Sequence, residues 1–359
     1  MNIDRDVLHK LLETGVKHGA SDIHFRPGAP PMYRVHGELV PLKSAKLVPA
    51  VTESVALLVA ERQLDETTVR ELDELDTSYS LPGVARFRVN IYRQRGSLAL
   101  VLRIIPSELP SLEKMGMPPV LADIAMTERG LVLVTGATGS GKTTTLAAML
   151  DVINEQRASH ILTIEDPIEF LHPNKLASVS QRELGLDTRS YITGMRSALR
   201  QDPDVILVGE MRDAESIDIA LKAAETGHVV FSTVHTTDAV KTINRIVSVF
   251  PAEEQKAARL RLAESLAATI SQRLLPRADR AGMVAACEIM ICTGSARDAI
   301  ADPSQGALTD IIEKGAQQYG MQSFDQHLVA LFRSKVITKE TALRASSNPS
   351  DFERNLSFT

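Results

Sequence analysis

The chain has 359 residues and carries 40 Lys and Arg residues against 45 Asp and Glu residues, which gives a formal net charge of −5. At about 100–200 residues per domain, this length predicts two or three domains. No apolar run approaches the roughly 18 residues of a membrane-spanning helix, and the start, Met1 to Asp6, lacks the basic and then apolar order of a secretion signal. We therefore expect an intracellular protein rather than a membrane-spanning or exported one.

Composition disfavours two further classes. The two cysteines, Cys287 and Cys292, are too few for a disulfide framework or a four-thiolate zinc site. We expect two reduced, partly buried thiols and no structural metal. The mildly acidic balance and the lack of a basic tail disfavour bulk nucleic-acid binding, although a local basic stripe would be compatible with it.

The first hundred residues indicate a small α+β domain. Apolar side chains recur at helical spacing between Val7 and Leu12. Residues 32–37 and 85–91 alternate between apolar and polar side chains, as half-buried strands do. The following segment holds four prolines, which break both helices and central strands. We predict an N-terminal domain over residues 1–105, a linker or hinge over residues 106–119 and a second domain over residues 120–359.

The rest of the chain alternates short apolar runs with helical patterns. This is typical of a parallel sheet covered by helices on both faces, an α/β fold. From about Glu253 the pattern is mostly helical, and apolar residues at four-residue intervals from Leu262 to Leu274 predict a core-facing helix. The predicted strands are Leu131–Thr135, Ile161–Ile164, Val205–Val208 and Val229–Val234, and the predicted helices are Lys142–Asn154, Tyr191–Arg200 and Ser216–Thr226.

The strongest motif is GATGSGKT, residues 136–143, which fits G-x-x-x-x-G-K-S/T and lies between a predicted strand and a predicted helix. In such a loop, backbone N–H groups and the positive end of the helix bind a phosphate chain. Lys142 is expected to reach the β- and γ-phosphates of ATP, and Thr143 to bind Mg²⁺. A simple glycine-rich turn is the alternative.

A second candidate site lies at the end of the predicted strand 205–208. An Asp followed by a Glu ordinarily stands at such a strand end beside a nucleotide, and here Gly209 and Glu210 take these places. We expect Glu210 to orient or deprotonate the water that attacks the γ-phosphate. A structural carboxylate is the alternative.

Because Gly209 offers no carboxylate, the magnesium shell needs another acidic residue. The predicted strand 161–164 ends in several, at the edge where ligands of an open α/β sheet bind. Glu165 is the first candidate, and Asp166 or Glu169 the second. A helix cap or a turn is the alternative role for these carboxylates.

Two histidines flank the predicted strand 229–234. His228 precedes it and His235 ends it, and at seven residues apart they are not spaced as metal ligands. His235 would end a strand beside the strand of Glu210, which favours a γ-phosphate sensor over the structural role usual for an isolated histidine. The same two roles are open for His228.

An arginine-rich strand lies in the N-terminal domain. Alternation along residues 85–91 places Arg86, Arg88 and Asn90 on one face, and Arg103 follows farther along the chain. These side chains form either the solvated face of an edge strand or guanidinium groups that reach a nucleotide from outside the phosphate-loop domain.

Taken together, these segments resemble the type II/IV secretion ATPase family, and within it the motors that retract type IV pili. The resemblance runs over nearly the whole chain, from residues 20–24 to the helical tail. It implies a hexameric ring ATPase with an N-terminal PAS-like α+β domain and a RecA-like P-loop ATPase domain that ends in a helical region. The segments that carry it are GATGSGKTTTLAAML, TIEDPIEF, QRELGLDT, LRQDPDVILVGEMRDAESI, AAETGHVVFSTVHTTDAVKTINRIVSVFP and GMQSFDQHL.

The resemblance also implies roles for single residues. The family's Walker A motif, acidic box, atypical Walker B motif and histidine box match positions in this chain, and two arginines match those that reach the nucleotide from the N-terminal domain. The implied catalytic residues are Lys142, Glu210, His235, Arg88 and Arg103. The implied nucleotide-binding residues are Gly136, Ala137, Thr138, Gly139, Ser140, Gly141, Lys142, Thr143, Thr144 and His228. The implied metal ligands are Thr143, Glu165 and Glu169.

Retraction of a pilus is the function that the resemblance favours. Assembly and secretion motors of the family usually carry an extra N-terminal domain and often a four-cysteine zinc insertion, whereas this chain begins almost at their second domain. Residues 297–305 depart from the Ala-Ile-Arg helix usual in retraction motors. An accessory retraction motor or an assembly ATPase therefore stays open, as do a nucleic-acid translocase and a regulatory subunit that hydrolyses little ATP.

The resemblance also implies partners and a location. We expect a homo-hexamer at the cytoplasmic face of the inner membrane. It would dock on a PilC-like pilus platform protein and act on the pilin fibre indirectly. Neither nucleic-acid binding nor direct insertion into the membrane is expected.

Overall fold

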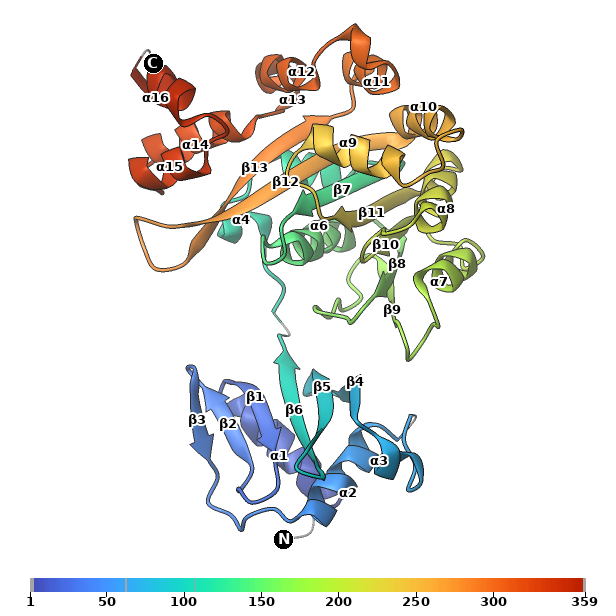
Figure 1. Ribbon diagram of the computed structural model, residues 1–359, viewed down its shortest axis with the longest axis vertical. Helices are drawn as coiled ribbons and strands as arrows, with labels where there is room; N and C mark the ends of the chain where they lie inside the picture. Colours follow the sequence, from blue (N-terminus) through green and yellow to red (C-terminus); the bar gives the residue numbers. More distant parts are fainter. Residues whose placement is uncertain (1–2, 62, 107, 358–359) are drawn as a thin grey trace. The chain divides into compact units, whose positions relative to one another are not determined.

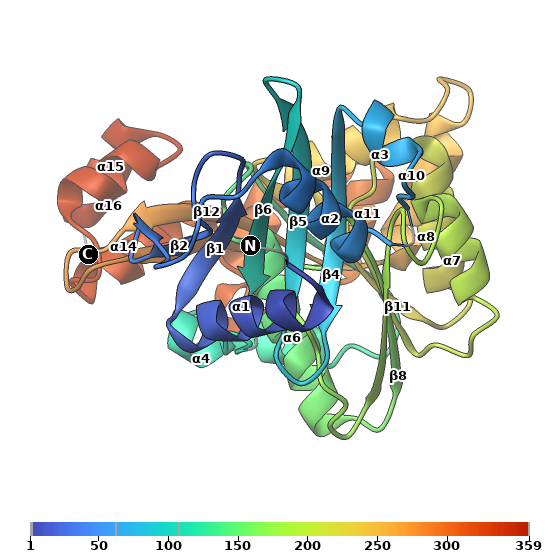
Figure 2. The same ribbon diagram turned by 90° about the horizontal axis from the view of Figure 1, so that it is seen from below.

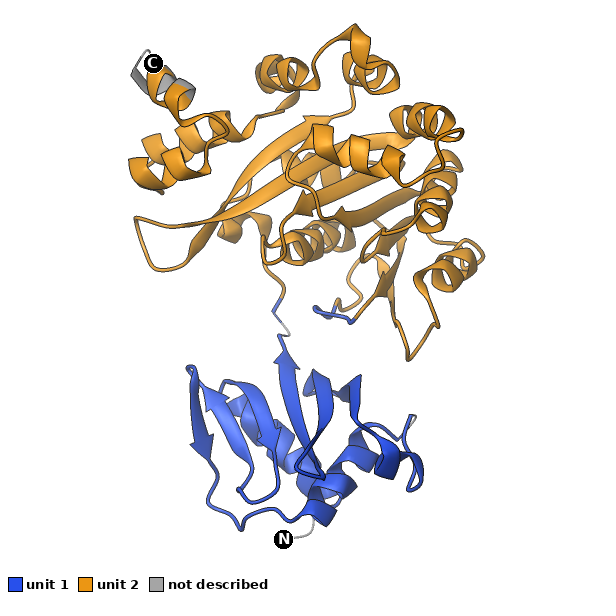
Figure 3. Ribbon diagram, viewed as in Figure 1, with its two compact units in different colours: residues 1–108, 167–171 blue, residues 109–166, 172–359 orange. Residues whose placement is uncertain are grey.

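A computed structural model describes residues 3–61, 63–106 and 108–357 of the chain. The chain divides into two compact units (Figure 3). Unit 1 comprises residues 1–108 and 167–171, and unit 2 comprises residues 109–166 and 172–359. The division after Glu108 falls inside the proline-rich segment 106–119, whereas residues 167–171, expected in the second domain, belong to unit 1.

Unit 1 is an antiparallel sheet with helices packed against it (Figure 2). Among its described residues, the strand order is β3-β2-β1-β6-β5-β4. The first helix begins after Asp4, whose side chain accepts a hydrogen bond from the N–H of Val7, and it buries Leu8 and Leu12 as predicted. The elements are α1 (Arg5–Lys17), β1 (Ala20–Phe25), β2 (Met32–Val35), β3 (Glu38–Pro41), α2 (Pro49–Val59), α3 (Thr68–Glu71), β4 (Glu74–Leu81), β5 (Ala85–Gln94) and β6 (Ser97–Ile105).

Unit 2 is a sheet of parallel strands with one antiparallel edge strand (Figure 1). Among its described residues, the strand order is β13-β12-β7-β11-β10-β8-β9. The four predicted strands and three predicted helices are confirmed. The strands and their helices are β7 (Gly130–Gly136), α6 (Lys142–Gln156), β8 (His160–Glu165), β9 (Ser178–Glu183), α7 (Tyr191–Ala198), β10 (Val205–Val208), α8 (Ala214–Glu225), β11 (Val229–Val234), α9 (Ala239–Ser248), α10 (Gln255–Ser265), β12 (Leu266–Pro276) and β13 (Met283–Ile291).

Both faces of this sheet are covered, which explains the continuous apolar runs of its strands. Along β7, Leu131 and Leu133 face the core under α7 to α10, while Val132 and Val134 face the core under α6. The short helices α4 (Leu112–Met115) and α5 (Val120–Ala125) pack on the α6 side, and α4 lies inside the segment predicted as a linker.

The helix predicted from Leu262 to Leu274 is wrong beyond Ser265. The helix α10 ends there and the chain continues as β12, which pairs in parallel with β7 and antiparallel with β13. The physical reason is that a four-residue spacing fits a helix turn but is also twice the period of a strand. The same leucines therefore satisfy both patterns, and pairing with β7 decides between them.

The C-terminal region after β13 is helical, as expected. Phe324, the first residue of α14 (Phe324–Arg333), packs against the β12–β13 ribbon, and the guanidinium of Arg273 lies 4.0 Å from the centre of its ring. Residues 297–305 form the end of α11 and a short 3₁₀ turn. The elements are α11 (Gly294–Ala301), η1 (Pro303–Gln305), α12 (Leu308–Lys314), α13 (Ala316–Tyr319), α14 (Phe324–Arg333), α15 (Lys339–Ala345) and α16 (Pro349–Ser357).

Two predictions from composition concern thiols and membranes. Both cysteines are free, and burial raises the pKa of Cys287 to about 12 and that of Cys292 to about 11, so neither is a reactive thiolate. Within the described ranges, no helix is long and apolar enough to cross a membrane.

Candidate nucleotide site

The phosphate loop connects β7 to α6 at the carboxyl edge of the sheet. Its glycines Gly136, Gly139 and Gly141 have φ angles of 146°, 77° and 88°, in the region that favours glycine. A Cβ on Gly136 would lie 2.4 Å from Ser140 Oγ and 2.6 Å from the carbonyl oxygen of Gln272. Only glycine allows the loop to pass this closely over β12.

Lys142 is the first residue of α6 and is 8% exposed. Its Nζ donates hydrogen bonds to the carbonyl oxygens of Gly136 at 3.0 Å and Ala137 at 2.9 Å. The ammonium group is thus held at the loop, where it can transfer these bonds to phosphate oxygens.

Three further features of the loop fit a phosphate chain. The hydroxyl oxygen of Ser140 is buried and has no hydrogen-bond partner among the described residues. The first N–H groups of α6, those of Lys142, Thr143 and Thr144, have no partner within the helix and carry its positive dipole end. The residue before them is a glycine in the left-handed region, so no side chain caps these groups.

Polar side chains of β12 support the loop, and the sequence reasoning missed them. Gln272 Nε2 donates to Thr145 Oγ1 at 2.8 Å, and Thr135 Oγ1 donates to Ser271 Oγ at 2.9 Å, all four residues being buried. A Gln and a Ser inside an apolar run were the available signal, but that run was predicted as a helix.

Glu210 and His235 come together, as predicted. Glu210 follows β10 and His235 follows the neighbouring β11, and His235 Nε2 lies 3.5 Å from Glu210 Oε2. The Glu210 side chain is 15% exposed and also pairs with Arg212, which is 77% exposed. Sequence reasoning gave Arg212 no role. Glu210 is therefore a largely buried carboxylate in contact with two basic side chains, and it lies at the sheet edge that carries the phosphate loop.

Gly209 is held tightly beside this pair. Its N–H donates to the carbonyl of Ile164 at 2.9 Å, and its carbonyl accepts from Thr233 Oγ1 at 2.7 Å. A Cβ here would lie 2.9 Å from the hydroxyl of Tyr191. Burial, and then the charges of Asp166 and other nearby carboxylates, raise the pKa of Tyr191, which therefore stays protonated. The tyrosine hydroxyl takes the space that an Asp side chain would need.

The acidic residues at the end of β8 and just beyond it are not arranged as a metal site. Glu165 is buried, and its Oε1 accepts from Thr163 Oγ1 at 2.6 Å and from Gln181 Nε2 at 3.1 Å. Glu169 is exposed and belongs to the segment grouped with unit 1. In the part of the chain that the structure describes, no cluster of three or more His, Cys, Asp or Glu side chains could hold a metal ion.

The spacing of the strands also separates Glu165 from the phosphate loop. Because β11 and β10 lie between β7 and β8, and adjacent strands are about 4.8 Å apart, the ends of β7 and β8 are about 14 Å apart. The metal-ligand role of Glu165 and Glu169 stays a prediction.

The structure does not bring His228 to the phosphate loop of its own chain. His228 precedes β11, and its carbonyl accepts from the N–H of Gly130 at the start of β7. Its ring Nδ1 lies 3.0 Å from the carbonyl oxygen of Ala223. His235 follows the same strand seven residues later, about 23 Å away at 3.3 Å per residue. The nucleotide role of His228 stays a prediction.

The two arginines of unit 1 lie together. Arg88 on β5 is paired directly with Arg103 on β6, and the neighbouring Phe87 and Val89 are fully buried, so the predicted alternation is confirmed. Arg103 Nε lies 2.9 Å from Asp22 Oδ1. Burial acts to raise the pKa of Asp22, but the hydrogen bonds from Arg103 and Ser21 and the positive charge of Arg103 together outweigh it, so the pKa is lowered.

Both arginines are exposed, but unlike Arg103, Arg88 forms no ion pair among the described residues. It is therefore the guanidinium of this pair that is available to a phosphate. Its role at the nucleotide stays a prediction.

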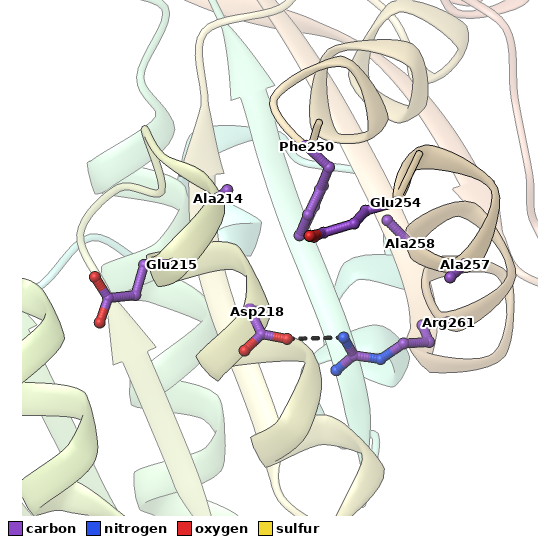
Figure 4. Close-up of a pocket in the computed structure, with 8 residues that line it drawn as sticks. All are labelled: Ala214, Glu215, Asp218, Phe250, Glu254, Ala257, Ala258 and Arg261. Atoms are coloured by element: carbon purple, nitrogen blue, oxygen red, sulfur yellow. Dashed lines mark hydrogen bonds and ion pairs between the residues drawn. The ribbon is translucent and has the colours of Figure 1, made fainter. Parts of the chain in front are cut away.

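A separate surface pocket of about 350 Å³ lies between α8 and α10 (Figure 4). Phe250 lines it, and Arg261 is bound by Asp218 at 2.8 Å and by Glu225 at 2.7 Å. These helices pack on the face of the sheet opposite α6. Because the arginine is already satisfied, we assign this pocket no part in nucleotide binding.

Comparisons with known proteins find similarity over nearly the whole chain. The family model of the type II/IV secretion system protein matches residues 2–341. The type IV pilus retraction ATPase PilT of Pseudomonas aeruginosa is 47% identical over 96% of this chain and 99% of its own length. The type IV pilus ATPase PilU of the same species is 38% identical over 95% of this chain and 89% of its own.

A solved structure extends the likeness to the fold. The crystal structure of the pilus retraction motor PilT with bound ADP superposes with a TM-score of 0.84, at 41% identity, over 97% of this chain and 99% of that one. This match confirms the predicted arrangement of an N-terminal domain followed by a RecA-like ATPase domain. The PAS-like character of unit 1 stays a prediction.

Proposed function

Because the chain belongs to the type II/IV secretion system protein family, we propose that it is an ATP-hydrolysing motor that drives type IV pilus retraction. The observation that carries this proposal is the phosphate loop, with Lys142 held over it, at the same sheet edge as the Glu210–His235 pair. It occurs in a chain 47% identical to a pilus retraction ATPase over nearly its full length.

Each residue of the site has a separate role in ATP hydrolysis. Lys142 and the first N–H groups of α6 bind and orient the phosphates. Glu210 orients or deprotonates the attacking water, and His235 senses the γ-phosphate from the next strand. The Thr143 hydroxyl would hold Mg²⁺, which when bound would supply positive charge to the phosphates. The orphan hydroxyl of Ser140 and the uncapped helix end support this assignment.

Two classes of alternative are less well supported. The acidic net charge disfavours a nucleic-acid translocase, and a shielded carboxylate at the strand end disfavours a subunit that hydrolyses little ATP. An accessory motor is the second candidate, because PilU also matches over 95% of the chain, though at 38% identity. The higher identity to PilT favours retraction.

The proposal also covers the oligomeric state of the motor, its location and its partner. The motor is a homo-hexameric ring at the cytoplasmic face of the inner membrane, where it docks on a PilC-like platform protein. Arg88 and Arg103 of unit 1 supply guanidinium groups to a nucleotide, and residues 106–119 act as the hinge. The exposed, unpaired state of Arg88 supports this role.

A deletion strain complemented with variants tests the proposal. For a retraction motor, loss of the gene gives more surface pili and no twitching motility. The parent gene restores motility and Lys142→Ala does not, because the variant lacks the charge that contacts the β- and γ-phosphates. Loss of pili would instead identify an assembly motor. Normal ATP hydrolysis by purified Lys142→Ala would refute the site.

A further inference from the structure

A buried carboxylate lies near the hydrolytic site but outside the motifs that compose it. Glu288 is in the middle of β13 and is 7% exposed. Its Oε1 accepts a hydrogen bond of 2.8 Å from the N–H of Ala239, the first residue of α9. Among the residues that the structure describes, it forms no ion pair. A buried carboxylate without a counter-ion is costly, so the bond to α9 is what holds it.

The N–H that Glu288 binds ends a short loop with functional residues. This loop, residues 235–238, runs from β11 to α9 and begins with His235, whose ring lies 3.5 Å from Glu210. The other hydrogen bonds of the loop are local. Asp238 Oδ1 accepts from the N–H of Lys241, and Thr236 Oγ1 bonds Thr242 Oγ1. These bonds tie the loop to α9 but do not tie α9 to the sheet.

Glu288 adds a hydrogen bond between α9 and the sheet to the apolar packing of Ala239 and Ile243. The helix α9 packs across β12 and β13 (Figure 1), and β13 is paired with β12 from Ala268 to Pro276. The strand β12 in turn pairs with β7, which ends in the phosphate loop. A change in the bond at Ala239 would therefore move the His235 loop relative to β12 and β7, the second of which ends in the phosphate loop.

We propose that Glu288 is a positioning residue of the hydrolytic site, which fixes the first turn of α9 and thereby holds His235 beside Glu210. The inference depends on the proposed ATPase function. Glu288 itself touches neither of these side chains and acts through the backbone of Ala239.

The charge of Glu288 makes this anchor sensitive to pH. Burial raises its pKa to about 7, and Asp238 adds to the rise, whereas the Ala239 N–H, Arg273 and Lys241 oppose it. His327 of α14, which accepts a hydrogen bond from the N–H of the neighbouring Cys287, is neutral because burial lowers its pKa to about 4. Above about pH 7 Glu288 is therefore charged, and a charged acceptor at a helix N-terminus bonds more strongly than a neutral one.

The sign of the stability effect separates positioning from folding. A carboxyl group whose pKa is raised in the folded state stabilises the protein at low pH, and this contribution is lost as the pH rises toward 7. Glu288→Gln keeps the acceptor oxygen and removes the charge. It should therefore leave the protein at least as stable as the parent at pH 8, while weakening the anchor.

The experiment compares steady-state ATP turnover of the full-length parent, Glu288→Gln and a control, Glu264→Gln, in which an exposed carboxylate of α10 is removed. We expect the ratio of parent kcat to Glu288→Gln kcat to rise from about 1 at pH 6 to about ten-fold at pH 8, the difference between a charged and a neutral hydrogen bond. The KM for ATP should change less than about two-fold. The control ratio should stay near 1.

A second measurement does not depend on activity. Hydrogen exchange of the α9 N-terminal peptide should be about ten-fold faster in Glu288→Ala than in the parent, and unchanged in Glu264→Gln. A kcat ratio that does not vary with pH, or unchanged exchange in Glu288→Ala, would overturn the proposal. A parent that hydrolyses no ATP would instead overturn the proposed function, and the exchange experiment would still decide whether Glu288 anchors α9.

Discussion

Gly209→Ala tests why a glycine stands where related nucleotide sites ordinarily have an Asp. The φ angle of Gly209 lies outside the left-handed region, so alanine is allowed there by the backbone. The obstacle is steric: the new Cβ would lie 2.9 Å from the hydroxyl oxygen of Tyr191 and 3.4 Å from the carbonyl oxygen of Ile164. The first of these contacts is too short and forces the tyrosine to shift.

The expected magnitude combines two opposing effects. Overpacking of this kind costs about 2 kcal/mol. Replacing glycine by alanine also restricts the unfolded chain, which stabilises the protein by about 0.7 kcal/mol. The net destabilisation of Gly209→Ala is therefore about 1.3 kcal/mol. For a unit of this size it lowers Tm by roughly 3–5 °C.

The tyrosine provides the decisive comparison. Tyr191→Phe removes the hydroxyl, after which the nearest ring atom, Cε1, lies 3.6 Å from the new Cβ, an ordinary contact. In this background Gly209→Ala should be neutral or stabilising by up to about 0.7 kcal/mol, so the sign of its effect reverses. Gly294→Ala, at a glycine with open space around it, serves as the control and should not lower Tm.

Thermal unfolding of the parent, the two single variants and the double variant, followed by circular dichroism, measures the coupling between Gly209 and Tyr191. Gly294→Ala is unfolded in the same way as the control. An equal loss of stability from Gly209→Ala with and without Tyr191→Phe would show that the tyrosine hydroxyl does not dictate the glycine. The reasoning that Tyr191 excludes an Asp from this site would then fail.

The remaining predictions concern catalysis and acid stability. Glu210→Gln should keep nucleotide binding but lower kcat about 10²-fold, measured as steady-state phosphate release, because a positioned base is lost; unchanged turnover would remove Glu210 from the mechanism. Arg88→Ala should lower turnover by up to ~10³-fold without changing Tm, whereas the exposed Arg70→Ala should leave both unchanged; equal turnover in the two variants would identify a merely solvated face. Burial lowers the pKa of His327 to about 4, so stability falls as the pH drops below 6.5, by about 2 kcal/mol at pH 5. Urea unfolding should show that His327→Gln, which keeps an acceptor for the N–H of Cys287, loses most of this pH dependence; an identical pH profile would refute the assignment.

The central strands were predictable because burial on both faces leaves little choice of residue. Leu131 to Thr135 is apolar or small throughout, and both of its neighbours in space are also buried strands. The phosphate loop was predictable for a different reason. Its glycine positions are dictated by backbone geometry, as the close approach at Gly136 illustrates, so the motif is visible without knowledge of the fold.

The error at β12 has a physical origin. Leu262, Leu266 and Ile270 are buried, and their four-residue spacing is compatible with both a helix and a strand. The pairing partner of β12 is β7, more than a hundred residues earlier in the chain. No local pattern contains that information, so the same residues that support the phosphate loop, Gln272 above all, were hidden in a wrongly predicted helix.

The missed site residues share this dependence on distant contacts. Tyr191 acts on Gly209 across two elements, and Glu288 reaches Ala239 from a strand almost fifty residues later. In the sequence both are ordinary members of a helix and an apolar strand. The identity of a motif residue is constrained by the ligand that the motif is expected to bind, so it is visible in the sequence. The identity of a positioning residue is constrained by its tertiary contacts, which the sequence does not show.

The order of the strands also constrains where the proposed hydrolytic site lies. Because β11 lies between β7 and β10, Glu210 stands about 10 Å across the sheet edge from the strand that ends in the phosphate loop, two strand spacings away. With the roles proposed for Lys142 and Glu210, the γ-phosphate and the attacking water would meet above the end of β11, where His235 begins the loop to α9. The position of that loop would then set the geometry of attack, and for this reason we expect a residue that fixes α9 to change turnover without touching the nucleotide.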